Sequence, residues 1–392
     1  MVARIKSQEL DRGKPLWETW IVEGLEGGHF AMISKTHHCM IDGVSGADLL
    51  SVVLSATPET PVEEVPRWIA RPAPTPLALL RDEALERIRG PLGFASRLLQ
   101  HPTTTLAGVR DGLAAVGETL SSGLRSASPT PFNQPIGPHR RFDWALTDIA
   151  AIREIRGHLG GSLNDVVLAT VAGAVRRFLE RRSVRLADID FRVFVPVSLR
   201  KPDDRDTLGN RVAGWMVDLP IAERDPRKRL ARIQETTAKL KESKQAAGSE
   251  ILTEVLEWTG PVLLGLAMRL APQGGLFNMV VTNVPGPPHP LYLLGARMLA
   301  AYPMVPLSLD QGLGIALFSY AGKLHWGFNA DWEVVPDLHD FVADVNAAFA
   351  ELSEAARTAP PLKRAPRQAV AHGIRPDVGA SVAPAVQPTG SS

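Results

Sequence analysis

The chain of 392 residues is 45% hydrophobic and 22% charged, which is typical of a globular protein too long for one hydrophobic core. A formal net charge of +1 argues against a nucleic-acid partner, and a single cysteine excludes an internal disulfide framework. The sequence has no signal-peptide pattern and no run of about 18 apolar residues that could span a bilayer, so we expect a cytoplasmic α/β protein of two lobes.

The N-terminal segment combines a predicted β-hairpin with a loop rich in histidine. Strands at residues 20–23 and 29–36 flank Glu26-Gly27-Gly28, a typical tight turn between antiparallel strands. The second strand leads directly into His37-His38-Cys39-Met40-Ile41-Asp42-Gly43. Ser45, with Asp48 three residues later, predicts the start of a helix through Leu54. The histidine motif should therefore lie on a loop between a strand and a helix, a common place for catalytic residues.

Residues 58–138 differ in character from the segments on either side. Six prolines between positions 58 and 76 predict an extended linker. Two stretches that follow, at 77–99 and 106–124, carry apolar residues at helical spacing. These predicted amphipathic helices either pack against the lobes or contact lipid and acyl chains, and the spacing alone does not decide between the two.

Residues 139–359 carry the densest pattern of predicted helices and strands. A capping box at Ser162 and Asp165 marks the start of one long helix. We expect helices at 147–159, 162–182, 226–244 and 337–355, two more within 250–270, and strands at 191–197, 212–219, 279–283, 291–299, 314–320 and 324–330. The chain then divides into a partial N-terminal lobe (1–57), the linker with its helices (58–138), the remaining fold, mainly a C-terminal lobe (139–359), and a disordered Ala- and Pro-rich tail (360–392).

The histidine pair is the strongest candidate for catalysis. A neutral histidine within reach of a hydroxyl group can act as a general base. Adjacent side chains of an extended segment point to opposite sides, so one histidine should act while the other packs or hydrogen-bonds. Asp42 either orients the base or braces the loop through an arginine, and Gly43 ends the turn. A zinc site would need further ligands, and neither a second cysteine nor a His-x-x-x-His spacing lies nearby.

Other polar motifs have less chemical meaning on their own. In Gly43-Val44-Ser45-Gly46 the second glycine comes one residue too early for a nucleophile elbow, so Ser45 is better explained as a helix cap. Asn164 and Asp165 stand at a predicted helix start, where capping accounts for them. The run Thr282-Asn283-Val284-Pro285-Gly286-Pro287 predicts the end of a strand followed by a tight turn.

The motifs together resemble those of a known family. Their order along the chain is Pro15-Leu16-Trp17-Glu18, the motif at 37–43, Ser162-Leu163-Asn164-Asp165, Val195-Pro196-Val197-Ser198-Leu199-Arg200, Gly209-Asn210 and the run at 282–287. This series resembles the bacterial wax ester synthase/diacylglycerol acyltransferase family over about residues 8–356. The resemblance implies a two-lobed α/β fold like that of chloramphenicol acetyltransferase and other CoA-dependent acyltransferases, with mixed sheets flanked by helices and an active-site tunnel between the lobes.

The resemblance also implies a role for each motif. His38, in a motif completed by His37 and Gly43, would deprotonate the hydroxyl of a diacylglycerol or a long-chain alcohol, which attacks the acyl-CoA thioester without an acyl-enzyme. Asp42 would hold the loop with Arg200 as its candidate partner, and Asn164 and Asp165 would support the site. Asn283, Pro285 and Gly286 would line the tunnel or stabilise charge on the thioester oxygen. No metal or other cofactor is implied, because acyl-CoA is a substrate.

The products implied are triacylglycerol or wax esters, and the partners are acyl-CoA and a lipid acceptor, not nucleic acid. The expected location is cytoplasmic, with peripheral contact at the inner membrane face or at lipid droplets. Family members usually carry a longer segment before the histidine pair, so we expect an N-terminally shortened member. Two alternatives stay open: a truncated paralogue that binds lipid droplets or acyl chains without turnover, and a condensation-type acyltransferase that uses a carrier-bound acyl donor.

Overall fold

The computed structural model describes residues 1–40, 50, 53–59, 72, 74–82, 84–85, 100, 126–198, 212–242, 275–307 and 310–360. The strands are β1 (Trp17–Leu25), β2 (His29–Thr36), β3 (Arg140–Asp148), β4 (Phe191–Ser198), β5 (Val212–Leu219), β6 (Met279–Pro285), β7 (Tyr292–Leu293), β8 (Ala296–Arg297), β9 (Leu313–Tyr320) and β10 (Lys323–Asp331). The α-helices are α1 (Val2–Ser7), α5 (Ile149–Leu159), α6 (Leu163–Arg181), α7 (Pro226–Glu242) and α10 (Leu338–Arg357).

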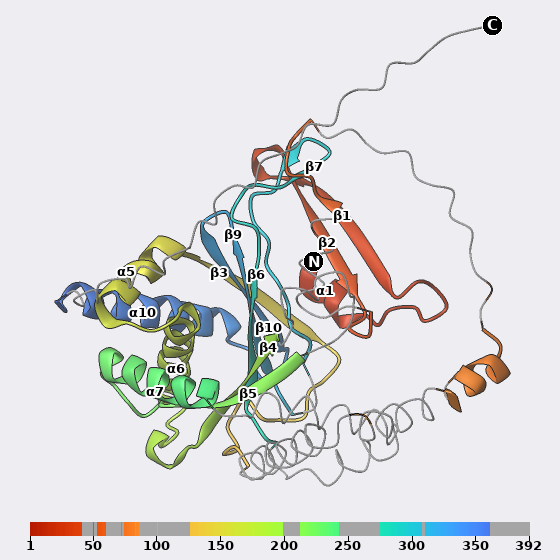
Figure 1. Ribbon diagram of the computed structural model, residues 1–392. Helices are drawn as coiled ribbons and strands as arrows, with labels where there is room; N and C mark the ends of the chain where they lie inside the picture. Colours follow the sequence, from red (N-terminus) through yellow and green to blue (C-terminus); the bar gives the residue numbers. More distant parts are fainter. Residues whose placement is uncertain are drawn as a thin grey trace, which may run out of the picture.

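A six-stranded mixed sheet forms the centre of the described structure. Its strand order is β3-β10-β9-β6-β4-β5. The pairs β3–β10, β10–β9 and β4–β5 are antiparallel, whereas β6 runs parallel to both β9 and β4. The fold is therefore mixed α/β, as the sequence predicts (Figure 1).

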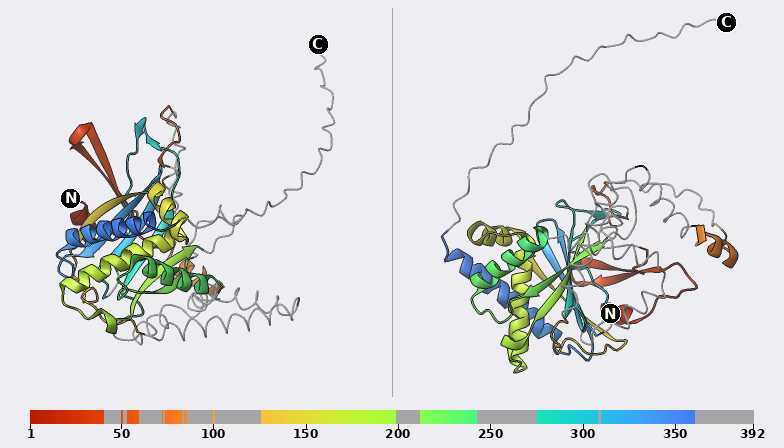
Figure 2. Two further views of the ribbon diagram at one scale, coloured as in Figure 1. Left: turned by 90° about the vertical axis from the view of Figure 1, so that its left-hand side faces the viewer. Right: turned by 60° about the horizontal axis from the view of Figure 1, so that its bottom comes forward.

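Four helices cover one face of this sheet, and the two further views place them together on that side (Figure 2). Trp326 and Phe328 of β10 alternate with residues that face the other way, and both are at most 1% exposed in a core shared with α6. Helix α6 is buried along most of its length because it packs between the sheet and the helices α7 and α10. Among the helices that the structure describes, none is both long and apolar enough to cross a membrane.

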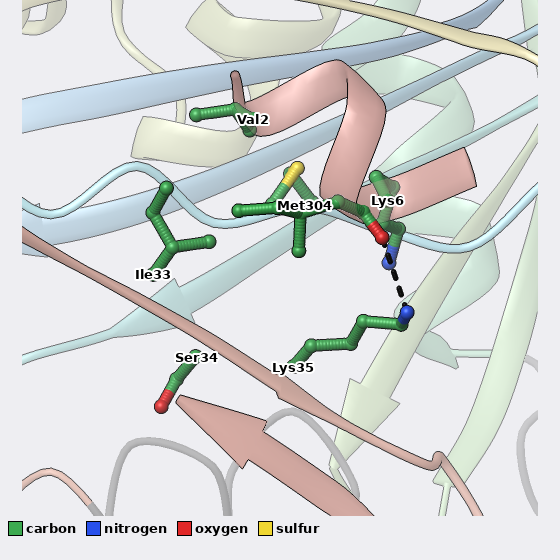
Figure 3. Close-up of a pocket in the computed structure, with 7 residues that line it drawn as sticks. Val2, Lys6, Ile33, Ser34, Lys35 and Met304 are labelled. Atoms are coloured by element: carbon green, nitrogen blue, oxygen red, sulfur yellow. Dashed lines mark hydrogen bonds between the residues drawn. The ribbon is translucent and has the colours of Figure 1, made fainter. Parts of the chain in front are cut away.

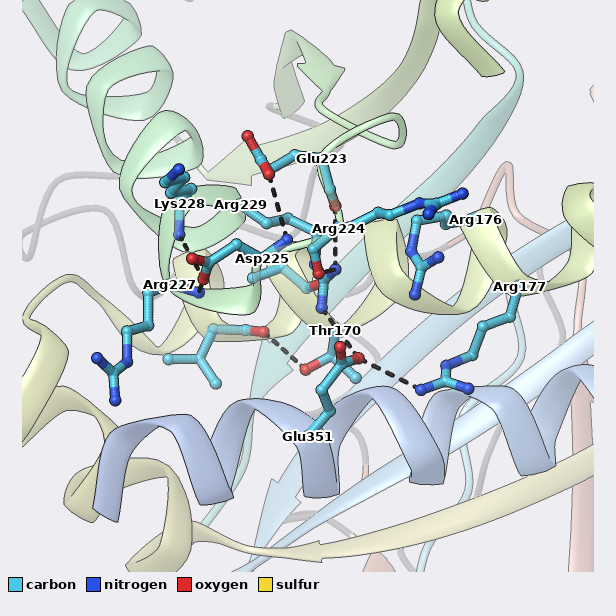
Figure 4. A network of polar contacts seen from close by, with 12 residues as sticks. Thr170, Arg176, Arg177, Glu223, Arg224, Asp225, Arg227, Lys228, Arg229 and Glu351 are labelled. Carbon is cyan, nitrogen blue, oxygen red and sulfur yellow. Dashed lines mark hydrogen bonds and ion pairs between the residues drawn. The ribbon is translucent and has the colours of Figure 1, made fainter. Parts of the chain in front are cut away.

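A buried arginine ties three of these helices together. Arg229 of α7 is 0% exposed; its Nε donates to the carbonyl oxygen of Ala169 in α6 at 3.1 Å, and its Nη2 lies 3.5 Å from a carboxylate oxygen of Glu351 in α10 (Figure 4). Gly173 of α6 permits this approach, because a Cβ at that position would lie 2.9 Å from Arg229 Nη2. The helix layer is thus cross-linked by one guanidinium group.

The face of the sheet away from the helices is partly covered by an extended segment at 298–307. Asn329 of β10 donates from Nδ2 to the carbonyl oxygen of Val305 at 2.9 Å. Gly327 lets this segment lie directly on the sheet, since a Cβ at that position would be 1.8 Å from the carbonyl oxygen of Pro303. A side chain at position 327 would therefore displace the covering segment.

The hairpin formed by β1 and β2 is a separate two-stranded sheet that extends from this same side of the molecule (Figure 1). Several of its large apolar side chains are half-exposed, including Trp17 at 55% and Ile21 at 53%. Helix α1 lies between the hairpin and the main sheet, and the backbone N–H of Arg140 in β3 donates to Ser7 Oγ at 2.9 Å. Helix α1 therefore connects the hairpin to the edge strand of the main sheet.

Most predicted elements are confirmed within a few residues, and three differences have clear causes. The strand predicted at 291–299 is wrong: β7 and β8 form a small hairpin, because Leu294 and Gly295 adopt positive φ angles of 48° and 85° and turn the chain back. The helix predicted from residue 147 begins at Ile149, because strand β3 occupies 140–148. The sequence prediction missed this strand, although the large apolar residues Phe142, Trp144 and Leu146 recur at every second position.

Several predictions fall outside the described residues. The helix start at Ser45 and most of the two amphipathic stretches at 77–99 and 106–124 lie there, as do the helices predicted within 250–270 and the tail beyond 360. The division of the chain into two lobes with a tunnel between them stays a prediction.

Candidate active site

The end of strand β2 places the histidine pair in a tight turn. The backbone N–H of His37 donates to the carbonyl oxygen of Leu16 at 2.9 Å, which continues the β1–β2 ladder by one residue. The N–H of Met40 then donates to the carbonyl oxygen of His37 at 3.0 Å and closes the turn. Both His37 and His38 are exposed, so the turn presents them to solvent or to a substrate.

The ring of His37 is engaged in this turn. Its Nδ1 accepts a hydrogen bond from the backbone N–H of Cys39 at 3.2 Å. A ring nitrogen that accepts carries no proton, so within this contact a hydrogen of the ring is on Nε2. His37 therefore braces the turn.

Three predicted site residues lie outside the described residues. They are Asp42 and Gly43, from the second half of the motif, and Arg200, the candidate partner of Asp42. Their roles stay predictions.

The predicted supporting residues meet where α6 begins and β6 ends. Asn283 of β6 donates from Nδ2 to Oδ1 of Asn164 in the first turn of α6, at 2.8 Å. The Oδ1 atom of Asn283 is buried and has no hydrogen-bond partner among the described residues. The structure thus brings together two motifs that are 119 residues apart in the sequence.

Asp165, in contrast, points into the protein. It is 3% exposed and accepts hydrogen bonds from the backbone N–H of Ser162 at 2.6 Å and from Oγ1 of Thr237 in α7 at 2.7 Å. With the return bond from Asp165 N–H to Ser162 Oγ at 3.2 Å, these contacts form the predicted capping box. Asp165 therefore fixes the start of α6, and through it the position of Asn164.

Pro285 is the last residue of β6, and Gly286 follows it directly. The N–H of Gly286 donates to Ser319 Oγ at 3.1 Å. A Cβ at position 286 would lie 2.3 Å from the Phe318 ring and 2.4 Å from the Ser319 carbonyl oxygen, so this site accepts only glycine. The glycine of this motif is explained by the close packing of the turn against β9.

A small hydrophobic cluster connects the chain after the histidine motif to this turn. Leu50 and Leu54 pack in one cluster with Phe318 of β9 and Val284 of β6. Ser55 and Tyr292 also exchange two backbone hydrogen bonds, each of 2.8 Å. Leu50, Leu54 and Ser55, which follow the histidine motif, are therefore held beside the residues at 283–287.

Two buried polar residues near these motifs were missed by sequence reasoning. Lys35 lies directly opposite Glu18 in the β1–β2 register, a pairing that a lysine and a glutamate on predicted partner strands could have indicated. His325 of β10 is 1% exposed and no motif pointed to it. In the part of the chain that the structure describes, no group of three His, Cys, Asp or Glu residues is placed to hold a metal ion.

The six-stranded mixed sheet with helices on one face has the fold of the CoA-dependent acyltransferases. Residues 1–167 match the wax ester synthase/diacylglycerol acyltransferase catalytic domain, and residues 208–353 match the C-terminal domain of the same enzymes. The chain belongs to the wax ester synthase/diacylglycerol acyltransferase family, whose members are acyltransferases.

Individual relatives agree with this assignment. A Mycobacterium tuberculosis protein named a diacylglycerol O-acyltransferase is 34% identical over 359 residues, which cover 88% of this chain and 68% of the relative. The protein tgs1 of the same species, named in the same way, is 31% identical over 90% of this chain and 74% of its own length.

Solved structures agree as well. The wax ester synthase/diacylglycerol acyltransferase from Marinobacter aquaeolei VT8 superposes with a TM-score of 0.62 at 25% identity, over 91% of this chain and 75% of that one. A structure of the nonribosomal peptide synthetase FmoA3, with a TM-score of 0.50 and 15% identity over 89% of this chain and 34% of that one, shares the fold alone.

Proposed function

We propose that this chain transfers a fatty acyl group from acyl-CoA to the hydroxyl group of a diacylglycerol or a long-chain alcohol, and that His38 is the general base. The products would be triacylglycerol or a wax ester. Family membership and the names of the relatives support this substrate class. Because the acceptors are water-insoluble lipids, the protein would work in peripheral contact with a membrane or a lipid droplet.

The reaction needs one base and no covalent intermediate on the protein. His38 takes the hydroxyl proton as the acceptor oxygen attacks the carbonyl carbon of the thioester. The tetrahedral intermediate collapses when its carbon–sulfur bond breaks, and the CoA thiolate receives the proton from His38. The turn at Asn283, Pro285 and Gly286 would line the site and stabilise the developing oxyanion, with Asn164 holding Asn283 in place.

The observation that carries this proposal is the engagement of His37. Its Nδ1 accepts from the Cys39 N–H, which gives it a bracing role in the turn, and the motif order assigns the base to the other histidine, His38. In the same proposal, Asp42 holds the loop through Arg200, Gly43 lets the chain turn into the following helix, and Asp165 supports Asn164 through the cap of α6.

The direct test compares two single variants. Purified protein is incubated with palmitoyl-CoA and either dioleoylglycerol or hexadecanol, and the release of free CoA is followed. We expect His38→Ala to lower the rate by at least about 100-fold, the usual contribution of a general base. His37→Asn keeps a hydrogen-bond acceptor for the turn and should retain a larger share of the activity.

Other outcomes would replace the proposal. CoA release by His38→Ala at the rate of the parent protein would contradict the role of this base. Turnover only with an acyl group on a phosphopantetheinyl carrier would identify a condensation-type enzyme. Lipid-droplet binding that His38→Ala leaves unchanged, without CoA release from either protein, would identify a lipid-binding paralogue.

A further inference from the structure

Lys35 joins three elements just before the histidine turn. Its Nζ donates to the carbonyl oxygen of Ile5 at 3.1 Å, to that of Gln8, and to Oε1 of Glu18 at 2.9 Å. An ammonium group has three donors, so all three are used. Its side chain is only 12% exposed, which makes each of these bonds costly to lose. Figure 3 shows Lys35 reaching from β2 to the backbone of α1.

The acceptors come from both neighbours of β2. Glu18 lies on β1 directly opposite Lys35 in the register, so the ion pair reinforces the hairpin. Ile5 and Gln8 are at the C-terminal end of α1, where carbonyl oxygens attract a cation, and the Ile5 oxygen also accepts from the backbone N–H of Gln8 at 3.3 Å. One ammonium group therefore fastens β1, β2 and α1 together.

Helix α1 is in turn fastened to the main sheet. Ser7 Oγ accepts from the backbone N–H of Arg140 in β3 at 2.9 Å, and Ile5 is buried. The β1–β2 hairpin forms no common sheet with the six-stranded sheet. The contacts from Lys35 to α1, and from α1 to β3, thus form a direct polar connection from the hairpin to the sheet that carries Asn283.

Lys35 is also close to the histidines along the chain. Only Thr36 separates it from His37, and the turn begins at His37. The contacts of Lys35 therefore lie two residues before the turn. Lys6 is not equivalent, because burial, Lys35 and Arg140 each lower the pKa of its side chain, in that order, whereas Lys35 forms an ion pair with Glu18.

We propose that Lys35, held by Glu18 and by the end of α1, is a positioning residue that fixes the histidine turn relative to the six-stranded sheet. The inference rests on the proposed function for its effect on catalysis. We call the three contacts of Lys35 Nζ, with Ile5, Gln8 and Glu18, the Lys35 clamp. A displacement of about 1 Å of a catalytic group can lower a rate by about 100-fold, so loss of the clamp should lower mainly kcat.

The test uses Lys35→Met, which keeps an unbranched side chain one atom shorter and removes all three donors, and Glu18→Gln, which removes one charge. The matched control is Lys323→Met, because Lys323 pairs across two strands with Asp148 at 2.6 Å but both side chains are about half-exposed. Steady-state kinetics with palmitoyl-CoA and dioleoylglycerol give kcat and KM for each protein.

A second readout does not depend on activity. Cys39 is the single cysteine of the chain, is exposed, and donates from its N–H to His37 within the turn. Its rate of reaction with Ellman's reagent under native conditions therefore reports on the turn itself. Thermal unfolding followed by circular dichroism confirms that each variant is folded at the assay temperature.

We expect Lys35→Met to lower kcat by about 10- to 100-fold with little change in KM, and to change the Cys39 rate several-fold. Glu18→Gln should change kcat and the Cys39 rate in the same direction but by less. Lys323→Met should change neither kcat nor the Cys39 rate. Unchanged Cys39 rates in Lys35→Met and Glu18→Gln would overturn the proposal, even if melting temperatures fall. If Lys35→Met does not fold, Glu18→Gln decides by the same criterion. An inactive parent protein would contradict the proposed function, while the Cys39 rates would still test the clamp.

Discussion

His325 lies on β10, on the sheet face that points away from the helices. Its ring packs edge-on against Tyr302 at 5.3 Å and tilted against Tyr320 at 6.1 Å between ring centroids. The side chain is 1% exposed, and neither ring nitrogen makes a hydrogen bond of normal geometry. Burial lowers the pKa of His325 below its usual 6.5, an interaction with the Tyr320 backbone opposes part of this shift, and the charge of Lys323 lowers the pKa as well.

This histidine should make the stability of the protein depend on pH. The unfolded chain binds a proton at His325 below about pH 6.5, whereas the folded chain resists it, so stability should fall as the pH drops below that value. The loss reaches at most about 1.4 kcal/mol per pH unit for one proton. In His325→Phe this contribution is gone, and melting temperatures measured from neutral to mildly acidic pH should decline less steeply than in the parent protein.

The parent protein is the reference for that comparison, because every other residue is the same in the two proteins. Equal slopes of melting temperature against pH in the two proteins would show that His325 is not held neutral by its surroundings. A steeper slope in His325→Phe would contradict the sign of the effect.

The chemistry of the histidine turn could be predicted at the level of residue types, but its polar supports could not. The motif order indicated His38 and Asn283, and the Ser162 capping box followed from local spacing. The bond between Asn164 and Asn283 depends on how β6 is placed against α6, which local sequence does not encode. The clamp at Lys35 needs the carbonyl oxygens of α1, a short helix that no periodic pattern reveals.

At the scale of whole elements, the packing of α6, α7 and α10 depends on Arg229. Replacing it with methionine leaves the carbonyl oxygens of Ala169 and Glu223 and the Glu351 carboxylate without this partner, in a layer where Arg229 itself is fully buried. We expect Arg229→Met to lower the free energy of unfolding by about 3 kcal/mol, because breaking a buried pair leaves the remaining polar groups without this partner. Chemical denaturation measures this difference.

Arg224→Met is the natural control, since Arg224 belongs to the same basic stretch yet its side chain is 84% exposed and lies 3.8 Å from Glu180 (Figure 4). Its loss should change the unfolding free energy by less than about 0.5 kcal/mol. Similar values for the two variants would mean that the methionine fills the space of Arg229 and that its hydrogen bonds add little.

The strands and helices themselves were largely predictable, and two exceptions, the missed strand β3 and the late start of α5, share one cause. Strands β9 and β10 are apolar runs bounded by turns, and α7 shows helical spacing, so both kinds of element follow from local pattern. Strand β3 sits at the sheet edge with Phe142 and Trp144 on one side, and its pattern merges into that of α5 without a turn between them. Where one element follows another directly, the boundary is set by tertiary pairing.

For the molecule as a whole, the β1–β2 hairpin and the six-stranded sheet should differ in local stability. The hairpin has two strands and half-exposed apolar side chains, whereas β9 and β10 are buried in the centre of the sheet. In hydrogen exchange followed by mass spectrometry, hairpin amides should exchange at least about 100-fold faster than those of β9 and β10. Comparable protection would show that the hairpin unfolds only together with the sheet.

The position of β3 at the edge of the sheet also bears on how the protein is made. This strand leaves the ribosome long before β10, its neighbour in the sheet, and in the interval its backbone and the aromatic rings of Phe142 and Trp144 have no strand beside them. Strand pairings between segments so distant in the sequence form slowly, and the intermediates that precede them are prone to aggregate. Completion of the sheet must therefore wait until Asp331 has emerged, so during synthesis the nascent chain should depend on chaperones that shield unpaired strand edges.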